Sequence, residues 1–177
     1  MTVNDLKFIV TGTPKVGKSA AIATLSEIPP VVAEEITISS SGETKSHSVV
    51  ALDYGQVTLD DDTIVRLYGS PGQERFRSMW EVLADGALGL IILVDNSRPD
   101  PVYDMSIYFE NFDSLIRNTS VVVGVSRVPD ANPEELDKYY GWFKERGIFA
   151  PALLVDPRNK KDMSTLMEAL VAMLEFA

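Results

Sequence analysis

The first residues able to do chemistry form the segment GTPKVGKS at Gly12–Ser19, which fits the phosphate-binding pattern Gly-x-x-x-x-Gly-Lys-Ser in full. Its glycines let consecutive backbone N–H groups turn toward phosphate oxygens, and the start of the following helix adds partial positive charge. Lys18 is expected to reach the β- and γ-phosphates, and the Ser19 hydroxyl to bind Mg²⁺. A glycine-rich turn with an incidental lysine is disfavoured, because the segment follows an apolar run and opens a helix. The predicted phosphate-binding residues are Gly12, Thr13, Pro14, Lys15, Val16, Gly17, Lys18, Ser19 and Ala20.

The composition restricts what other chemistry the chain can perform. Its 177 residues suit one domain with a substantial core, and we expect a single domain over residues 1–177. The chain has no cysteine and one histidine, His47, which excludes disulfides, thiolate chemistry and multi-histidine metal sites. A net charge of -10 argues against broad nucleic-acid binding and against adhesion to anionic lipid. No apolar run approaches the roughly 20 residues of a membrane helix, so we expect a cytoplasmic protein without stable membrane insertion.

Apolar runs alternate with helical patterns, and this order predicts a three-layer α/β fold with right-handed crossovers. The runs LGLIILVD and SVVVGVS are almost continuously apolar, as expected of strands covered on both faces. The pattern QVTLDDDTIVR at Gln56–Arg66 indicates a hairpin and therefore one antiparallel strand. We expect a six-stranded, mostly parallel sheet with one antiparallel edge strand, formed by Leu6–Thr11, Val49–Leu59, Thr63–Tyr68, Ala87–Val94, Ser120–Ser126 and Ala152–Val155.

Helical patterns lie between these strands. Asn132 before Pro133, and the pair Lys161-Asp162, are the expected capped starts of two helices, while Gly147 is placed where a helix ends. The polar, serine-rich stretch Pro29–His47 has no clear period and is expected to be a long loop. The predicted helices are Lys18–Ser26, Gln73–Ala84, Pro101–Arg117, Pro133–Arg146 and Asp162–Phe176.

The segment PGQERF at Pro71–Phe76 resembles switch II of Ras-like small GTPases, and the resemblance extends over essentially the whole chain. Within that superfamily, the proline before the glycine resembles the bacterial gliding-motility GTPase MglA. The runs SPGQERFRSMW, GALGLIILVD and ALDYG resemble the ATP/GTP-binding proteins encoded in bacterial conservon-type operons. The resemblance implies a P-loop NTPase fold and a molecular switch that binds GTP or GDP with Mg²⁺.

The resemblance also implies roles for two residues of this segment. The N–H of Gly72 would bind the γ-phosphate, and Gln73 would be the catalytic residue that orients the attacking water. The alternatives are a simple turn after Pro71 and a polar first residue of a helix. The family has an aspartate three residues before that glycine, where this chain has Gly69. We therefore expect a poorer Mg²⁺ shell and slow intrinsic hydrolysis that needs a partner.

The threonine hydroxyl that the family uses as a further Mg²⁺ ligand has no match at its usual position. Thr44, Ser46 and Ser48 are the nearby hydroxyl candidates. Ser48 is the best placed, so Ser19 and Ser48 are the predicted metal ligands, although a solvated loop serine is the alternative. Asp53 is a candidate substitute for the missing aspartate, but an exposed aspartate on an edge strand is the interpretation we favour.

The family reads guanine with an Asn-Lys-x-Asp motif at the end of a strand. Here Ser126 and Arg127 take the first two places, and Asp130 lies one residue later than the template. Pro129 would either return Asp130 to the base or make an ordinary surface turn, and both interpretations remain open. The resemblance favours guanine over adenine. The predicted base-contacting residues are Ser126, Arg127, Asp130 and, in the later loop VDPRNKKD, Asp156 and Arg158.

Phe76, Met79 and Trp80 share one face of the helix predicted after Gln73. Such a stripe is usually core, and we favour core for Trp80, whereas Phe76 is as well suited to anchor a partner. The resemblance implies a roadblock-type regulatory protein and a sensor kinase or other effector as partners. Arg75 and Arg77 are further candidates for a catalytic arginine within the chain, but no arginine is clearly placed for that role.

Three functions fit these patterns. The leading hypothesis is a guanine-nucleotide switch whose segments 44–48 and 70–77 respond to the γ-phosphate. The second is a degenerate P-loop interaction module that neither hydrolyses nor switches, as the departures at Gly69 and in the base motif suggest. A small P-loop kinase is the third, and it leaves the PGQERF segment unexplained.

Overall fold

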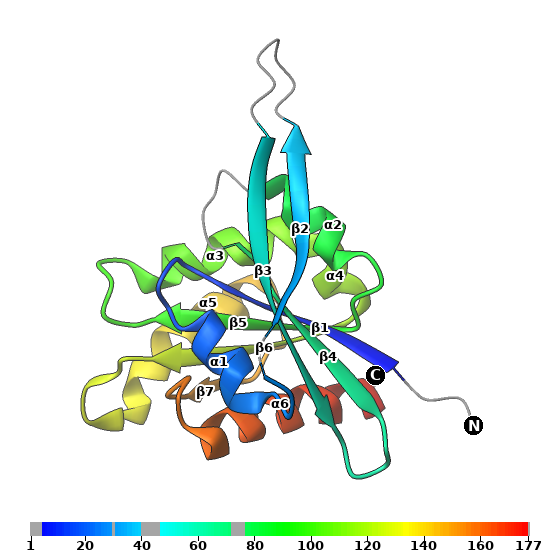
Figure 1. Cartoon of the computed structure of the whole chain (residues 1–177). Helices are drawn as coiled ribbons and strands as arrows, with labels where there is room; N and C mark the ends of the chain where they lie inside the picture. Colours follow the sequence, from blue (N-terminus) through cyan, green and yellow to red (C-terminus); the bar gives the residue numbers. More distant parts are fainter. Residues whose placement is uncertain (1–4, 30, 40–46, 72–76, 177) are drawn as a thin grey trace.

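The computed structural model describes residues 5–29, 31–39, 47–71 and 77–176, with the backbone alone described for 31–39 and 47–52. Seven strands form one sheet in these residues (Figure 1). The strands are β1 (Asp5–Gly12), β2 (Val31–Ser39), β3 (His47–Thr58), β4 (Ile64–Gly69), β5 (Gly89–Asp95), β6 (Ser120–Ser126) and β7 (Ala152–Leu154). The helices are α1 (Lys18–Leu25), α2 (Arg77–Ala84), α3 (Pro101–Asn111), α4 (Asp113–Asn118), α5 (Asp137–Arg146) and α6 (Lys160–Glu175).

The strands follow the order β2-β3-β4-β1-β5-β6-β7, and β3 alone runs against its neighbours within this described sheet. The predicted α/β fold with a mostly parallel sheet is confirmed. The sheet has one strand more than the six expected, because β2 forms within the stretch Pro29–His47 that was predicted to be a loop. This segment is a strand because its backbone pairs with β3, for example Ile36 with Val50. Such pairing uses backbone groups and is therefore open to a polar segment as well. As a result β3 is second from the edge, and the β2–β3 ribbon projects beyond the rest of the sheet in Figure 1.

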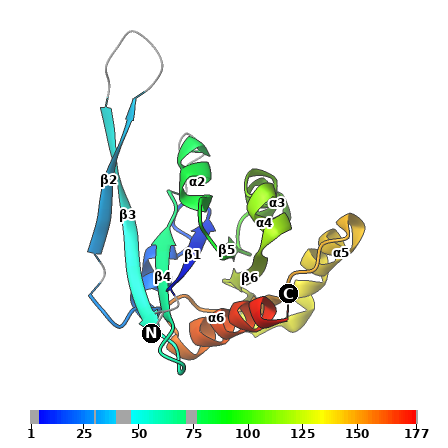
Figure 2. The same cartoon turned by 90° about the vertical axis from the view of Figure 1, so that its right-hand side faces the viewer.

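Helices cover both faces of the sheet and create two cores. The larger core lies under α2, α3, α4 and α5, and the other lies under α1 and α6; Figure 2 shows the helices on either side of the sheet. Every residue of β5 and of β6 is buried, as their apolar runs predict. No helix in the described part of the chain has both the length and the apolar character needed to cross a membrane.

Trp80 is the centre of the larger core, as expected from its place on the helical stripe. It is fully buried and stacks on Phe112 with ring centroids 5.6 Å apart. Its indole N–H donates to the Pro71 carbonyl at 2.8 Å, so the residue that precedes segment 72–76 is anchored to the core. Met79 is buried on the same helix. Phe76 lies outside the described residues.

Local sequence explains most helix boundaries, with three exceptions. Asp100 caps α3 by accepting from the Tyr103 N–H, and Gly147 ends α5 with a φ of 63°. The predicted helix 101–117 is divided at Phe112, whose ψ of 17° separates α3 from α4. The last helix begins earlier than predicted, because Asn159 and not the pair Lys161-Asp162 is its cap. The predicted helix Pro133–Arg146 begins as an α-helix only at Asp137, because Pro133–Leu136 forms a short 3₁₀ turn capped by Asn132.

Candidate functional site

The phosphate-binding segment joins the carboxyl end of β1 to the start of α1. Gly12 has a φ of 150°, and a Cβ there would lie 2.4 Å from the Leu93 carbonyl oxygen. Gly17 has a φ of 113° and would place a Cβ 2.9 Å from Pro157. A side chain at either position would clash, so both glycines of the motif are required for this path of the backbone. The path places the first turn of α1 beside the segment, where helix N–H groups favour an anion.

The Lys18 side chain folds back over the start of the segment that contains it. Its ammonium group donates to the carbonyl oxygens of Gly12 and Thr13, each at 2.7 Å. Burial lowers the pKa of Lys18 to about 8, and the nearby Asp53 carboxylate opposes that shift. A partly desolvated ammonium ion held by neutral carbonyls gains more from anionic oxygens, so this lysine is suited to a phosphate.

Asp53 on β3 supplies a carboxylate to the start of α1. The Ser19 hydroxyl donates to Asp53 Oδ2. At the end of β4, a Cβ on Gly69 would lie 3.2 Å from the Asp53 Cβ and 3.6 Å from its Oδ2. The space that an aspartate at 69 would occupy is therefore next to the Asp53 side chain. The interpretation of Asp53 as an exposed edge aspartate is wrong, because β2 lies outside β3 and the residue is half-buried.

Ser19 and Asp53 together fit a magnesium ion. Both offer hard oxygen donors, which Mg²⁺ prefers, and they bond each other at the start of α1, directly after the phosphate-binding glycines. Within the described residues, no three His, Cys, Asp or Glu side chains gather into a metal site. A cation here would therefore need oxygens from a bound nucleotide as well. For the other predicted metal ligand, Ser48, the backbone alone is described, and it pairs with Ile38 in the β2–β3 ladder.

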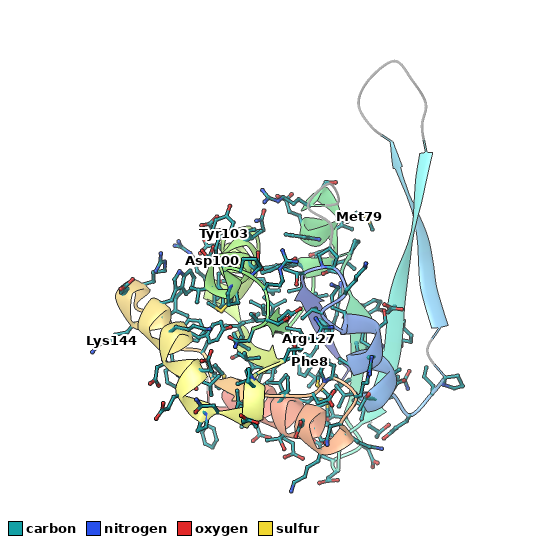
Figure 3. All side chains as sticks on the ribbon, turned by 90° about the vertical axis from the view of Figure 1, so that its left-hand side faces the viewer. Phe8, Met79, Asp100, Tyr103, Arg127 and Lys144 are labelled. Atoms are coloured by element: carbon teal, nitrogen blue, oxygen red, sulfur yellow. The ribbon has the colours of Figure 1, made fainter. Side chains whose placement is uncertain are left out.

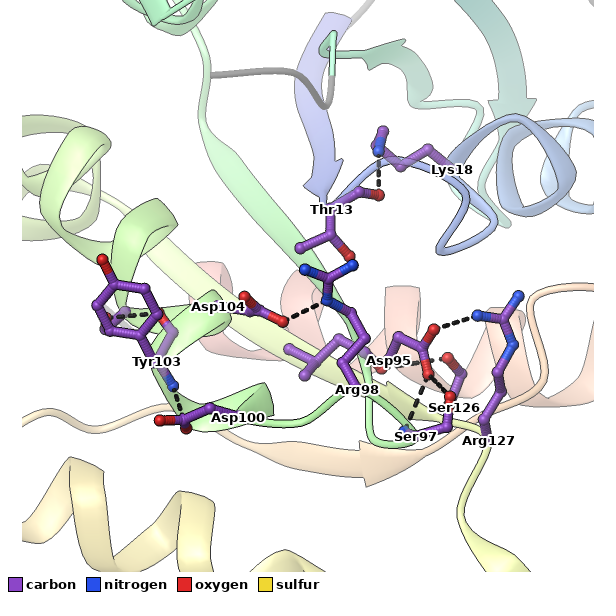
Figure 4. A network of polar contacts seen from close by, with 12 residues as sticks. Thr13, Lys18, Asp95, Ser97, Arg98, Asp100, Tyr103, Asp104, Ser126 and Arg127 are labelled. Atoms are coloured by element: carbon purple, nitrogen blue, oxygen red, sulfur yellow. Dashed lines mark hydrogen bonds and ion pairs between the residues drawn. The ribbon is translucent and has the colours of Figure 1, made fainter.

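Arg127 connects the end of β6 to the phosphate-binding segment. It has a φ of 56° and donates through Nη1 to Asp95 Oδ2 and through Nη2 to the Lys15 carbonyl at 3.1 Å. Burial acts to raise the pKa of Asp95, but hydrogen bonds from Ser97 and Arg127 outweigh it and hold that pKa below its ordinary value. Figure 4 shows this network from close by, and Figure 3 labels Arg127, whose side chain is 51% exposed.

A cavity of about 580 Å³ opens between Arg127 and the phosphate-binding segment, a size typical of small-molecule sites. The loop after β7 forms its other wall. Asp156 Oδ1 accepts from the Arg158 N–H, and Asp162 Oδ2 accepts from the Asp156 N–H, both at 2.9 Å. Asp162 was not predicted as a site residue; its position in the first turn of a helix that begins beside this loop was the available signal. The lining includes Lys15, Val16, Gly17, Ala20, Ser126, Arg127, Ala131, Asp156, Arg158 and Asp162.

Asp130 is not among the residues that line this cavity, although its neighbour Ala131 is. Asp130 has a φ of 53° and lines a separate hollow with Pro129, Asn132 and Glu135. Ser126 is buried, and its hydroxyl donates to the Val94 carbonyl at 3.1 Å, which joins β6 to β5. Other predicted residues lie outside the described part of the chain, namely Thr44, Ser46, Gly72, Gln73 and Arg75.

Comparisons with known proteins address the family and the fold of the chain. A family model described as conserved hypothetical ATP binding protein matches residues 31–177, beginning after the phosphate-binding segment. The chain also resembles a bacterial selenocysteine-specific elongation factor, EF-Sec, with a TM-score of 0.71 over 98% of this chain and 29% of the other, at 15% identity. That likeness shows the fold.

Two curated proteins are similar in sequence. Intraflagellar transport protein 22 of Chlamydomonas reinhardtii is 26% identical over 63% of this chain, and an uncharacterized protein of Methanocaldococcus jannaschii is 28% identical over 55% of it. The matched region spans 55% and 56% of those proteins, about half of their length. With the phosphate-binding segment, the findings support a nucleotide-binding protein with a P-loop NTPase fold.

Proposed function

We propose that the chain, which belongs to the family of conserved hypothetical ATP binding proteins, is a nucleotide-dependent switch of the bacterial small-GTPase type, similar to MglA and the conservon-encoded proteins. It binds GTP or GDP with Mg²⁺ and hydrolyses GTP slowly unless a partner assists. Its regulator is a roadblock-type protein and its effector a sensor kinase or related protein, in the cytoplasm. The partners follow from the sequence resemblance alone.

One observation carries the proposal: the Ser19 hydroxyl bonds the Asp53 carboxylate at the start of α1, and the charge of that carboxylate acts on Lys18, which lies over the phosphate loop. A lysine with a depressed pKa, a hydroxyl and a carboxylate are the groups that a triphosphate with its cation requires. When bound, Mg²⁺ would neutralise charge between the two terminal phosphates. The chain's own part is to hold that cation, with the Asp53 carboxylate in place of the aspartate absent at Gly69.

The proposed choice of base rests on the cavity wall that Arg127 forms with the loop after β7, which carries Asp156 and Arg158. Arg127 offers its aliphatic stem to a base plane, and the Asp156 carboxylate has acceptor sites on both oxygens beyond the one at Oδ1 that accepts from the Arg158 N–H. A carboxylate accepts the two N–H groups of guanine, which adenine cannot offer in the same way. Guanine is therefore proposed, in contrast to the ATP of the family description.

Calorimetric titration of nucleotide-free protein with GTP, GDP and ATP, each with and without Mg²⁺, tests the proposal. Tight, Mg²⁺-dependent and guanine-selective binding is the expected result. Binding of ATP with equal or greater affinity contradicts the choice of base, and weak, Mg²⁺-indifferent binding contradicts the switch. The second outcome favours the degenerate interaction module, for which the separation of Asp130 from the cavity is the specific observation.

A further inference from the structure

Arg98 lies at the same edge of the sheet as the phosphate loop. It is in the turn between β5 and α3, and its backbone N–H donates to the Asp95 carbonyl at 3.3 Å. Asp95 also accepts from the N–H and the hydroxyl of Ser97, at 3.0 and 2.6 Å. The turn that carries Arg98 is therefore held to the buried end of β5, which lies beside β1 in the sheet.

The Arg98 side chain is held by one carboxylate. Its Nε–H donates to Oδ2 of Asp104, a residue in the first turn of α3 with a side chain 14% exposed. This bond raises the pKa of Arg98 above its ordinary value, so the group stays charged. No described residue accepts from its two terminal nitrogens, and the side chain is 44% exposed. Held through Nε, a guanidinium presents its other N–H groups in a fixed direction.

That direction is toward the phosphate loop. Figure 4 shows the Arg98 guanidinium directed at Thr13, the second residue of the loop. Thr13 is 7% exposed, and its hydroxyl oxygen is buried with no hydrogen-bond partner in the described structure. An orphaned polar group beside a loop built for phosphate indicates that the site is complete only with a ligand.

Two other cations at the loop, Lys18 and Arg127, are already engaged in hydrogen bonds. Lys18 donates to two loop carbonyls, and Arg127 donates to Asp95 and to the Lys15 carbonyl. Arg98 differs from them in having terminal N–H groups that no described side chain or carbonyl uses. A planar guanidinium binds phosphate oxygens through paired hydrogen bonds.

We infer that Arg98 contacts the terminal phosphate of a bound nucleoside triphosphate, as a cation supplied by the chain itself and positioned by Asp104. The inference rests on the proposed function, since it needs a triphosphate in the loop. It assigns this contact to the turn after β5, in which the sequence patterns single out no residue. It also separates the triphosphate from the diphosphate, because a diphosphate lacks the group that Arg98 would bind.

The test compares the affinities of GDP and of the non-hydrolysable analogue GppNHp for wild type, Arg98→Ala and Arg98→Lys. Arg117→Ala is the matched control, because Arg117 also pairs with an aspartate but lies on α4, away from the loop. We expect Arg98→Ala to lower the GppNHp affinity about tenfold and to change the GDP affinity by less than about twofold, as for loss of one charge-assisted contact. The affinity of Arg98→Lys should fall between those of wild type and Arg98→Ala, and the control should match wild type.

Equal losses for both nucleotides, or no loss for either, would overturn the inference, because a structural arginine does not distinguish them. Asp104→Asn gives a second reading, since it loosens Arg98 without removing its charge. It should lower the GppNHp affinity less than Arg98→Ala does, and an unchanged affinity contradicts the positioning role. If the wild type binds neither nucleotide, the proposed function itself fails, and that result is distinct from a defect confined to Arg98→Ala.

Discussion

At the phosphate end of the site the ligand would be met mainly by backbone N–H groups, whereas at the base end it would be met by individual side chains. The backbone path of the phosphate loop has no space for a Cβ at positions 12 and 17, so both must be glycine. A local sequence motif is therefore enough to predict this end of the site. The base end depends on where Arg127 and the loop after β7 meet in space. Changes at the phosphate end should therefore affect all nucleotides, and changes at the base end should affect their ratio.

The largest effect is expected at Lys18. Lys18→Ala removes the ammonium group nearest to the phosphates and should weaken GTP and GDP binding about a hundredfold, the value of a partly buried charged contact. Lys144→Ala, on the exposed surface of α5, is the control and should bind as wild type does. Calorimetry measures the affinities of both variants. Unaltered binding by Lys18→Ala would show that the loop does not hold phosphate.

Asp53 also belongs to the phosphate end of the site, but we expect it to act on the nucleotide through Mg²⁺. Asp53→Ala should reduce the gain in GTP affinity that Mg²⁺ provides by about thirtyfold, with little change in its absence, as for loss of a group that supports a metal. Titrations with and without Mg²⁺ measure this gain, with Asp60→Ala in the exposed turn before β4 as control. An unchanged Mg²⁺ dependence would remove Asp53 from the cation site.

The exchange variant Asp53→Gly/Gly69→Asp tests whether the carboxylate can return to β4. Removing the Asp53 side chain clears one close neighbour of a Cβ at 69, leaving the flexible end of Ile22 at 3.0 Å. Part of the Mg²⁺ dependence of GTP binding should return, as the same titrations would measure. If the exchange variant folds but its GTP affinity depends on Mg²⁺ no more than that of Asp53→Ala, a carboxylate at position 69 does not replace one at position 53.

The depressed pKa of Lys18 makes nucleotide binding depend on pH. Phosphate prefers the charged lysine, so the GDP affinity should fall about tenfold between pH 7 and pH 9, across a pKa of about 8. The free protein should respond in the opposite sense: the unfolded chain binds more protons above pH 8, so the free energy of unfolding rises with pH there. Calorimetry and denaturant unfolding across this pH range measure the two responses. Lys18→Ala should remove both, and a flat affinity profile in wild type would contradict the burial of this amine.

The smallest effects are expected at the base end. Asp156→Asn should lower the ratio of GTP to ATP affinity about fivefold, as for loss of one good hydrogen bond. Asp130→Asn should change that ratio by less than about twofold, because Asp130 lines a different hollow. Competition titrations of the two variants measure both ratios. A larger effect at Asp130 would place the base against the hollow at Pro129 and reverse the comparison.

Much of the fold could be predicted from local patterns. The buried runs of β5 and β6, the cap at Asp100 and the glycine that ends α5 are each determined by neighbours in sequence. Strand β2 could not be predicted in this way, since its formation depends on pairing with β3, a separate segment of the chain. The break at Phe112 could not be predicted either, because no glycine or proline marks it in the sequence; in the structure the Phe112 ring stacks on Trp80, a residue from another helix.

The sequence by itself determined the phosphate loop, because its glycines and lysine act within a few residues of one another. Only the tertiary structure points to Asp53 as the proposed source of the missing carboxylate. Asp53 and Gly69 are 16 residues apart in sequence but lie on adjacent antiparallel strands, where the absence of one side chain leaves room for the other. The same holds for Arg98 and Thr13, since parallel strands bring the ends of β1 and β5 to one edge. Contacts between distant residues follow from strand order, which no local pattern contains.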